Sequence, residues 1–185
     1  MSIPKNDIKI TVGATVCEES KLRGDITIGA GCIIHPKATI LAEAGPIVIG
    51  DGCLIEELAV IIHKLPIDAP KLNDGESPPI LHIGPNNVFE VGCVCELSES
   101  IGQNNVIECK AYVGPKVKIT NGCIIGAACR ITRPQTIKEN IIIYGEECLQ
   151  REGLDKPTPQ TLQIDFLSRV LPSYHHLKRP NRKVN

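Results

Sequence analysis

Apolar side chains recur at every sixth position along most of the chain. The series reads Ile10, Val16, Leu22, Ile28, Ile34 and Ile40; then Ile49, Ile55 and Ile61; then Ile83, Phe89, Cys95, Ile101, Ile107, Val113, Ile119, Ile125, Ile131, Ile137 and Ile143. The residue two positions earlier is usually small or aliphatic, and the residue that follows is often glycine, as at Gly84. Because residues two apart on a strand face the same way, each hexad predicts a short strand with two inward side chains.

Three such hexads predict one triangular coil. The period of 18 is visible directly, because IGPNNVFE at 83–90 recurs as IGQNNVIE at 101–108. Stacked coils bury a continuous aliphatic column and pair their backbones in parallel. The sequence therefore predicts an all-β solenoid, a parallel β-helix of about seven triangular coils. Asn87 and Asn105 are expected to stack in adjacent coils, where their side-chain amides can bond one another.

Two interruptions divide the repeat. A short one at 42–46 adds three residues, and a long one after Ile61 is rich in Pro, Asp and Lys. Segments of the second composition form surface loops. We therefore expect one β-helix domain over 8–150, with a loop insertion at 62–80 that projects from one corner of the coil.

A helical pattern replaces the period of six after the last hexad. Thr158 and Pro159 suit the cap and the first position of a helix, and Pro172 is suited to end it. Apolar residues fall near helical spacing between these points, at Leu162, Phe166, Leu167, Val170 and Leu171. The pattern predicts one C-terminal helix over 158–172 that packs on the β-helix, followed by a basic, flexible tail at 178–185.

The composition agrees with a narrow, repeated cross-section. The chain has no Trp, two Phe and three Tyr, so rings are not the main filling of its core. A formal net charge of −1 argues against a nucleic-acid or membrane surface built from gross charge. No apolar run approaches the ~20 residues of a membrane helix, and the N-terminal residues lack the apolar stretch of a signal peptide. These features favour a reducing, cytoplasmic setting.

Nine cysteines would be a heavy and odd count for a secreted protein. Their register favours packing in a reducing compartment. The small inward position holds Cys32, Cys53, Cys93, Cys123 and Cys129, and a large inward position holds Cys95. Cys93 and Cys95 both face inward, yet two thiolates without further ligands make a poor metal site. We therefore expect buried thiols and no metal.

Solenoids of this class also carry enzymes, among them the gamma-class carbonic anhydrases, in which three histidines hold a zinc ion. That group has an Arg-x-Asp in an early coil, and Arg23-Gly24-Asp25 matches it. We expect the Arg23 and Asp25 side chains to remain as a structural or interface ion pair.

The zinc ligands of that group have no counterpart in this register. The three ligand positions hold Ile62, Pro85 and Glu90, and Glu56 and Glu57 stand for a preceding Gln-Asp pair. His63 comes one residue late, which on a strand sends its side chain to the other face. The remaining histidines, His35, His82, His175 and His176, lack usable spacing. A metalloenzyme of this type is an alternative hypothesis.

Hexapeptide acyltransferases are the second enzyme group built on this repeat. They use a histidine base at a loop or coil edge to deprotonate the acceptor. His63, at the root of the long loop, is the candidate for that role, although the spacing fixes no acidic partner for it. Acyl transfer is therefore a further alternative.

The sequence also resembles the hexapeptide-repeat subunits of the dynactin pointed-end complex. The segments that carry the resemblance are EAGPIVIGDGCLIEE at 43–57, IGPNNVFEVGC at 83–93, NNVIECKAYVG at 104–114, GCIIGAAC at 122–129 and PQTLQIDFLSRVLPSYHHLK at 159–178. Hexads alone are shared with many transferases, whereas the NNVFEVG segment and the helix ending in PSYHHLK are more specific. The loop and the last residues carry no part of the resemblance.

This resemblance implies a left-handed β-helix with no activity, no catalytic residues, no cofactor and no metal. It implies protein partners, namely dynactin subunit 5 as a heterodimer and the actin-related pointed-end protein of dynactin. No nucleic acid, membrane or small-molecule substrate is expected. The implied function is that of a non-catalytic structural and adaptor subunit, cytoplasmic and cytoskeleton-associated, which supports dynein-driven microtubule transport and cargo binding.

Overall fold

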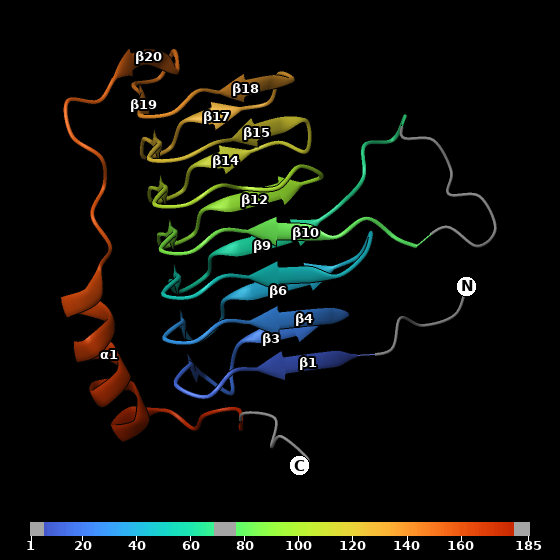
Figure 1. Cartoon of the computed structure of the whole chain (residues 1–185), viewed down its shortest axis with the longest axis vertical. Coiled ribbons are helices and arrows are strands. Elements are labelled where there is room, and N and C mark those ends of the chain that lie inside the picture. The colour runs from blue at the N-terminus through green and yellow to red at the C-terminus, as the bar shows by residue number, and fades with distance from the viewer. Residues whose placement is uncertain (1–5, 69–76, 180–185) are drawn as a thin grey trace.

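The computed structural model describes residues 6–68 and 77–179. In this part of the chain, short strands wind into a parallel β-solenoid of about 7 turns, and a single helix lies along its flank (Figure 1). The strands stack into three flat faces, one on each side of the triangular coil. This arrangement confirms the all-β solenoid predicted from the hexads.

Each face is a ladder of short strands. Face 1 contains β1 (Asp7–Ile10), β4 (Asp25–Ile28), β7 (Ile47–Ile49) and β10 (Leu81–Ile83), and continues through Ile101 to β15 (Val117–Ile119) and β18 (Gln135–Ile137). Face 2 contains β2 (Thr15–Val16), β5 (Ile33–Ile34), β8 (Leu54–Ile55), β11 (Val88–Phe89), β13 (Val106–Ile107), β16 (Ile124–Ile125), β19 (Ile141–Tyr144) and β20 (Leu149–Glu152). Face 3 contains β3 (Lys21–Arg23), β6 (Thr39–Ala42), β9 (Val60–His63), β12 (Val94–Leu97), β14 (Tyr112–Val113) and β17 (Arg130–Ile131). The last pair of face 2, β19 and β20, is antiparallel and ends the solenoid.

The two insertions lie at one corner of the coil, between faces 3 and 1. The short one joins β6 to β7, and the long one joins β9 to β10. They pack together so closely that a Cβ on Gly45 would lie 2.1 Å from the Pro79 carbonyl oxygen. The predicted bounds of 62–80 change at the start, because Ile62 and His63 belong to β9 and the connection begins at Lys64, while residues 69–76 lie outside the described residues.

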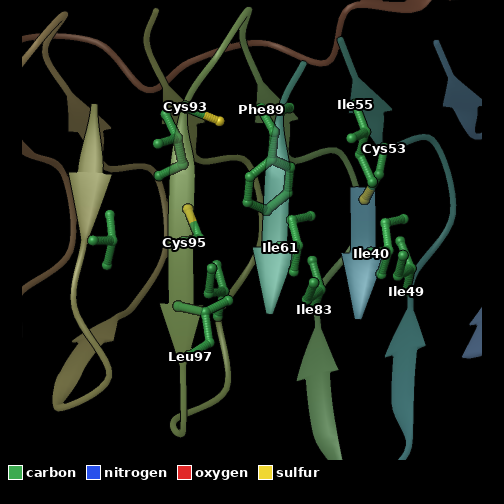
Figure 2. Packing of buried hydrophobic residues seen from close by; sticks show 14 of the residues in the cluster. Ile40, Ile49, Cys53, Ile55, Ile61, Ile83, Phe89, Cys93, Cys95 and Leu97 are labelled. Carbon is green, nitrogen blue, oxygen red and sulfur yellow. The ribbon is translucent and has the colours of Figure 1, made fainter. Parts of the chain in front are cut away.

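Inward side chains form one aliphatic column through the coils (Figure 2). Phe89 is its aromatic member among the described core residues and is fully buried, with Ile55 and Ile107 at the equivalent position in the neighbouring coils. The six cysteines predicted to face inward are buried in this column, and all nine are free thiols. Leu22 is only partly buried, because it lies in the first coil and has stacked neighbours on one side alone.

The asparagine ladder differs in detail from the prediction. Asn87 and Asn105 are fully buried in adjacent coils, but their amides bond backbone groups and not one another. The Asn87 side chain accepts a hydrogen bond from the Asn105 backbone N–H (2.9 Å) and donates to the carbonyls of Gly84 and Gly102 (2.7 Å each). Turns inside a solenoid leave backbone groups without ladder partners, and these side chains satisfy them.

Helix α1 (Thr161–Tyr174) packs on face 2, where Leu171 contacts a cluster of outward-facing aliphatic residues. Its bounds correct the predicted 158–172. Residues 158–160 are not helical, and Gln160 takes the cap position without a side-chain hydrogen bond. Pro172 does not end the helix, which continues to Tyr174, but its missing N–H leaves the Ser168 carbonyl without its i+4 donor.

A short segment after the helix, residues 175–178, returns to the first coil and is called here the C-terminal strap. Leu177 pairs antiparallel with Cys17, and the Lys178 N–H donates to the Val16 carbonyl at 2.8 Å. The strap thus supplies partners to the edge of β2, which is the first strand of face 2. The prediction of a flexible tail from Lys178 is wrong for that residue, and residues 180–185 lie outside the described residues.

Candidate functional site

The Arg-x-Asp motif is split by a corner of the coil. Gly24 adopts a φ of +97° and turns the chain from face 3, where Arg23 is exposed, to face 1, where Asp25 lies. The Asp25 carboxylate lies 3.6 Å from the Lys9 ammonium, and among the described residues it makes no ion pair with Arg23. The expected structural ion pair between Arg23 and Asp25 is therefore wrong, and an interface role for the two residues stays a prediction.

The positions that correspond to zinc ligands do not converge. Ile62 points outward from β9, while Pro85 and Glu90 lie at turns that follow β10 and β11. The Glu90 carboxylate instead accepts the backbone N–H of Cys109 at 3.0 Å. In the described part of the chain, no three metal-ligating side chains gather at one point.

The glutamates beside these turns have a structural role. Glu56 accepts the backbone N–H of Val91 at 3.1 Å, and Glu108 accepts that of Ala127 at 2.8 Å, so each carboxylate binds the turn of the next coil. The pKa of Glu56 is raised, and burial is the largest cause. These contacts explain the acidic residues at this corner without a catalytic or metal-binding role.

His63, the candidate base for acyl transfer, is buried inside the solenoid. Its side chain is fully inaccessible to solvent, and its Nδ1 lies 3.0 Å from the Gly45 carbonyl oxygen. Because a carbonyl can only accept, the proton lies on Nδ1, and the buried Nε2 has no hydrogen-bond partner. Burial lowers the pKa of His63 more than the Gly45 carbonyl raises it. An imidazole without solvent access cannot reach an acyl-acceptor substrate to remove its proton.

The buried imidazole of His63 predicts a pH-dependent stability. Its folded pKa lies below the ordinary value of 6.5, so the unfolded chain takes up the proton first as pH falls. The stabilising contribution is complete above the unfolded pKa and is lost as pH drops toward the folded pKa. We expect the Tm to fall between about pH 7.5 and about pH 5.5, and to fall less for His63→Asn, whose amide can still donate to the Gly45 carbonyl. Equal falls in both proteins would assign the pH dependence to other groups.

The remaining histidines lie at separate places in the fold. The Nδ1 of His175 lies 3.1 Å from a Glu19 carboxylate oxygen and so anchors the C-terminal strap to the first coil. The pKa of Glu19 is lowered first by its own backbone N–H and then by His175. His35 has a pKa lowered mainly by burial, and His82 lies exposed on face 1. No two of these residues form a nucleophile–base arrangement.

A polar hollow of about 430 Å³ lies at the C-terminal end of the solenoid. Its lining includes Arg130, Arg133, Gln135, Glu146, Glu147 and Gln150. The hollow contains no histidine, and its cysteine, Cys148, lies close to backbone groups of Arg130. Its Glu146 and Glu147 carboxylates could accept a proton, but no histidine, serine or activated thiol lies with them in the lining.

The outward-facing side chains distinguish the three faces, and sequence reasoning did not use them. On face 2 they are Ile33, Leu54, Val88, Val106, Ile124 and Ile142, in register from coil to coil. Four of these residues pack with Leu171, Ile164 and Leu167 of α1. The signal was available in the sequence, because each aliphatic residue directly precedes a large inward one. Reading that position in every third hexad would have identified the face that α1 covers.

The catalytic candidates from the sequence do not share a site in the part of the chain that the structure describes, since His63 is buried and Glu90 binds a backbone N–H. None of the described helices has the length and apolar character needed to span a membrane. The exposed faces and the flanking helix remain as the features able to contact a partner.

Comparisons with known proteins agree with this picture. The model of the family described as "Bacterial transferase hexapeptide (six repeats)" matches residues 100–133. Dynactin subunit 6 of Danio rerio is 56% identical over 176 residues, which cover 95% of this chain and 89% of that protein. Dynactin subunit 6 of Xenopus tropicalis is 50% identical over 182 residues, covering 98% and 90%.

A solved structure shares the fold. The hexapeptide transferase family protein of Anaplasma phagocytophilum superposes with a TM-score of 0.66 over 90% of this chain and 88% of its own. The two sequences are 16% identical, so the likeness concerns the solenoid and carries no activity with it.

Proposed function

Because the chain belongs to the dynactin subunit 6 family, we propose that it is a non-catalytic structural and adaptor subunit of the dynactin pointed-end complex. The observation that carries the proposal is the identity of 47 to 56% with relatives of that name, over 95% or more of this chain. In this function the solenoid presents flat faces to other subunits, and its interior serves only for stability.

The proposal includes the partners and the setting. A heterodimer with dynactin subunit 5 and a contact with the actin-related pointed-end protein are the proposed associations. Through them the subunit would support dynein-driven microtubule transport and cargo binding, in the cytoplasm and with the cytoskeleton. The net charge of −1 is compatible with assembly through shape and apolar contact and not through gross charge.

The test is incorporation into dynactin. The full chain, carrying an affinity tag, is expressed in cells, and the cytosol is separated by sedimentation. We expect the tagged chain to sediment with the other dynactin subunits and to recover them on affinity purification. A tagged hexapeptide acyltransferase serves as the control and should sediment on its own. If the chain behaves like this control, the proposed function is wrong.

Burial of His63 weighs against the acyltransferase alternative, and the residues at positions 62, 85 and 90 weigh against the anhydrase alternative. Ile62 and Pro85 have no group that binds zinc, which leaves Glu90 alone where three histidines are needed. We propose that the chain has no catalytic residue and no resident cofactor. Coenzyme A is accordingly expected to leave the Tm unchanged at a concentration that raises the Tm of the control acyltransferase.

A further inference from the structure

The three faces of the solenoid differ in what covers them. On face 2, α1 packs over the aliphatic residues from β5 to β13, and the C-terminal strap pairs with the first coil (Figure 1). On face 1, Lys9 forms ion pairs with Asp7 and Asp25. In the turn before β15, Lys116 pairs with Asp68 of the loop. No described helix or strand lies over face 3.

Face 3 nonetheless carries an aliphatic strip. Val60, Val94 and Tyr112 stack in one outward column, and Leu41 and Ile62 stack in the column beside it. All five side chains are partly exposed, on a flat sheet over which none of the described elements lies. Contiguous exposed apolar surface of this kind marks sites of protein interaction.

Positive charge lies at both ends of the strip. Lys21 and Arg23 are exposed on β3 at the first coil, and Arg130 is exposed on β17, with its guanidinium 4.5 Å from the centre of the Tyr112 ring. The acidic side chain among the outward residues of face 3 is Glu96, and the Lys64 ammonium lies 3.7 Å from its carboxylate. Within the described residues, Lys21, Arg23 and Arg130 make no ion pair, so the unpaired charge of face 3 is positive at each end.

This charge pattern disfavours a second copy of the chain as the occupant. Two identical faces can pack about a two-fold axis parallel to the solenoid or perpendicular to it. In the first case β3 faces β3 of the other copy, and in the second case β3 faces β17. Both arrangements bring basic ends together, and like charges across an interface cost free energy.

We propose that face 3 is the docking surface for a different subunit of the complex, one that presents a flat sheet face with an aliphatic centre and carboxylates at both ends. Leu41, Val60, Ile62 and Val94 would form the dry centre of the contact. Lys21, Arg23 and Arg130 would pair with the carboxylates at its rim. This inference rests on the proposed function, since it assigns the surface through which the chain joins its partner.

The test compares a charge placed on face 3 with the same charge on face 1. Ile62→Glu and Val48→Glu both alter a partly exposed outward residue of a short strand. The tagged full chains are expressed in cells, and the dynactin subunits that they recover are quantified. We expect Ile62→Glu to recover at least about tenfold less of the dynactin subunits than wild type does, as for loss of an interface hot spot. We expect Val48→Glu to recover the same amount as wild type. Recovery by Ile62→Glu at the wild-type level would overturn the proposal.

Further measurements distinguish docking on face 3 from misfolding, docking on α1 and self-association. The Tm of Ile62→Glu is first compared with that of Val48→Glu. If the Tm of Ile62→Glu is much lower, the recovery of dynactin subunits is measured instead with a variant that carries Lys21→Glu and Arg23→Glu, which are both exposed. Wild-type recovery by that variant would refute docking on face 3. Loss of recovery with Phe166→Glu on α1, but not with Ile62→Glu, would place the contact on the helix instead. A homodimer of the purified chain that Ile62→Glu dissociates would make a second copy the occupant. Failure of the wild-type chain to recover dynactin subunits would refute the proposed function itself.

Discussion

Replacement of Phe89 by alanine is expected to lower the free energy of unfolding by about 3–5 kcal/mol. Phe89 is fully buried and is the largest of the fully buried side chains. Its neighbours along the column, Ile55 and Ile107, belong to the adjacent coils, so the ring contacts three coils at once. Removal of the ring would leave a cavity that rigid stacked strands cannot close, and the loss would weaken two coil-to-coil contacts.

The matched control for this prediction is Phe166→Ala. Phe166 is the other phenylalanine of the chain, and it is 62% exposed on the outer side of α1. Its removal is expected to change the free energy of unfolding by no more than about 0.5 kcal/mol. Urea denaturation followed by circular dichroism measures both values. Similar losses for the two variants would mean that the column around Phe89 repacks readily, contrary to the structure.

The period of six was sufficient to predict the core, because one local rule repeats in every coil. Inward residues such as Ile61 and Cys93 follow from their place in a hexad, without knowledge of distant contacts. The hexad register was also sufficient to predict that the three zinc-ligand positions hold residues other than histidine. The left-handed sense of the helix, which the resemblance implies, stays a prediction.

Features that depend on distant contacts were predicted less well. Thr158 and Pro159 form a good local helix start, yet α1 begins at Thr161. The linker must run along face 2 from the last coil, and an extended residue spans about 3.3 Å where a helical one spans about 1.5 Å. Lys178 was assigned to a flexible tail because it lies in a basic segment, whereas the open edge of β2 provides it with a backbone partner.

The Arg23–Asp25 pair failed for a related reason. Two residues separated by one position on a strand face the same way, but Gly24 has a positive φ and lies at a corner. The Arg-x-Asp motif is present in the sequence, but the corner at Gly24 places the two side chains on different faces. Asp25 then found Lys9 as its partner in the coil below, a contact that only the stacking of coils defines.

Asn87 provides the second large expected effect. Asn87→Ala is expected to lower the free energy of unfolding by about 3 kcal/mol, because it leaves buried backbone groups without hydrogen bonds. These groups are the Asn105 N–H and the Gly102 carbonyl, which lie in the next coil. The Gly84 carbonyl also loses a hydrogen bond, but it still accepts from the Cys53 thiol at 3.2 Å. A hydrophobic replacement of similar size, Asn87→Leu, would fill the space and still leave these groups unsatisfied, so we expect it to rescue little.

Asn121→Ala is the matched control, since the Asn121 amide also bridges two coils by accepting the Gln103 N–H at 3.0 Å. Asn121 is only partly buried, so water can replace its contacts, and we expect a loss of less than about 1 kcal/mol. Urea denaturation compares the variants with wild type. A loss as small for Asn87→Ala as for Asn121→Ala would mean that water enters the coil at position 87. The hydrogen bonds of the buried Asn87 amide would then contribute little to stability, and the packing of the aliphatic column would hold the coils in register.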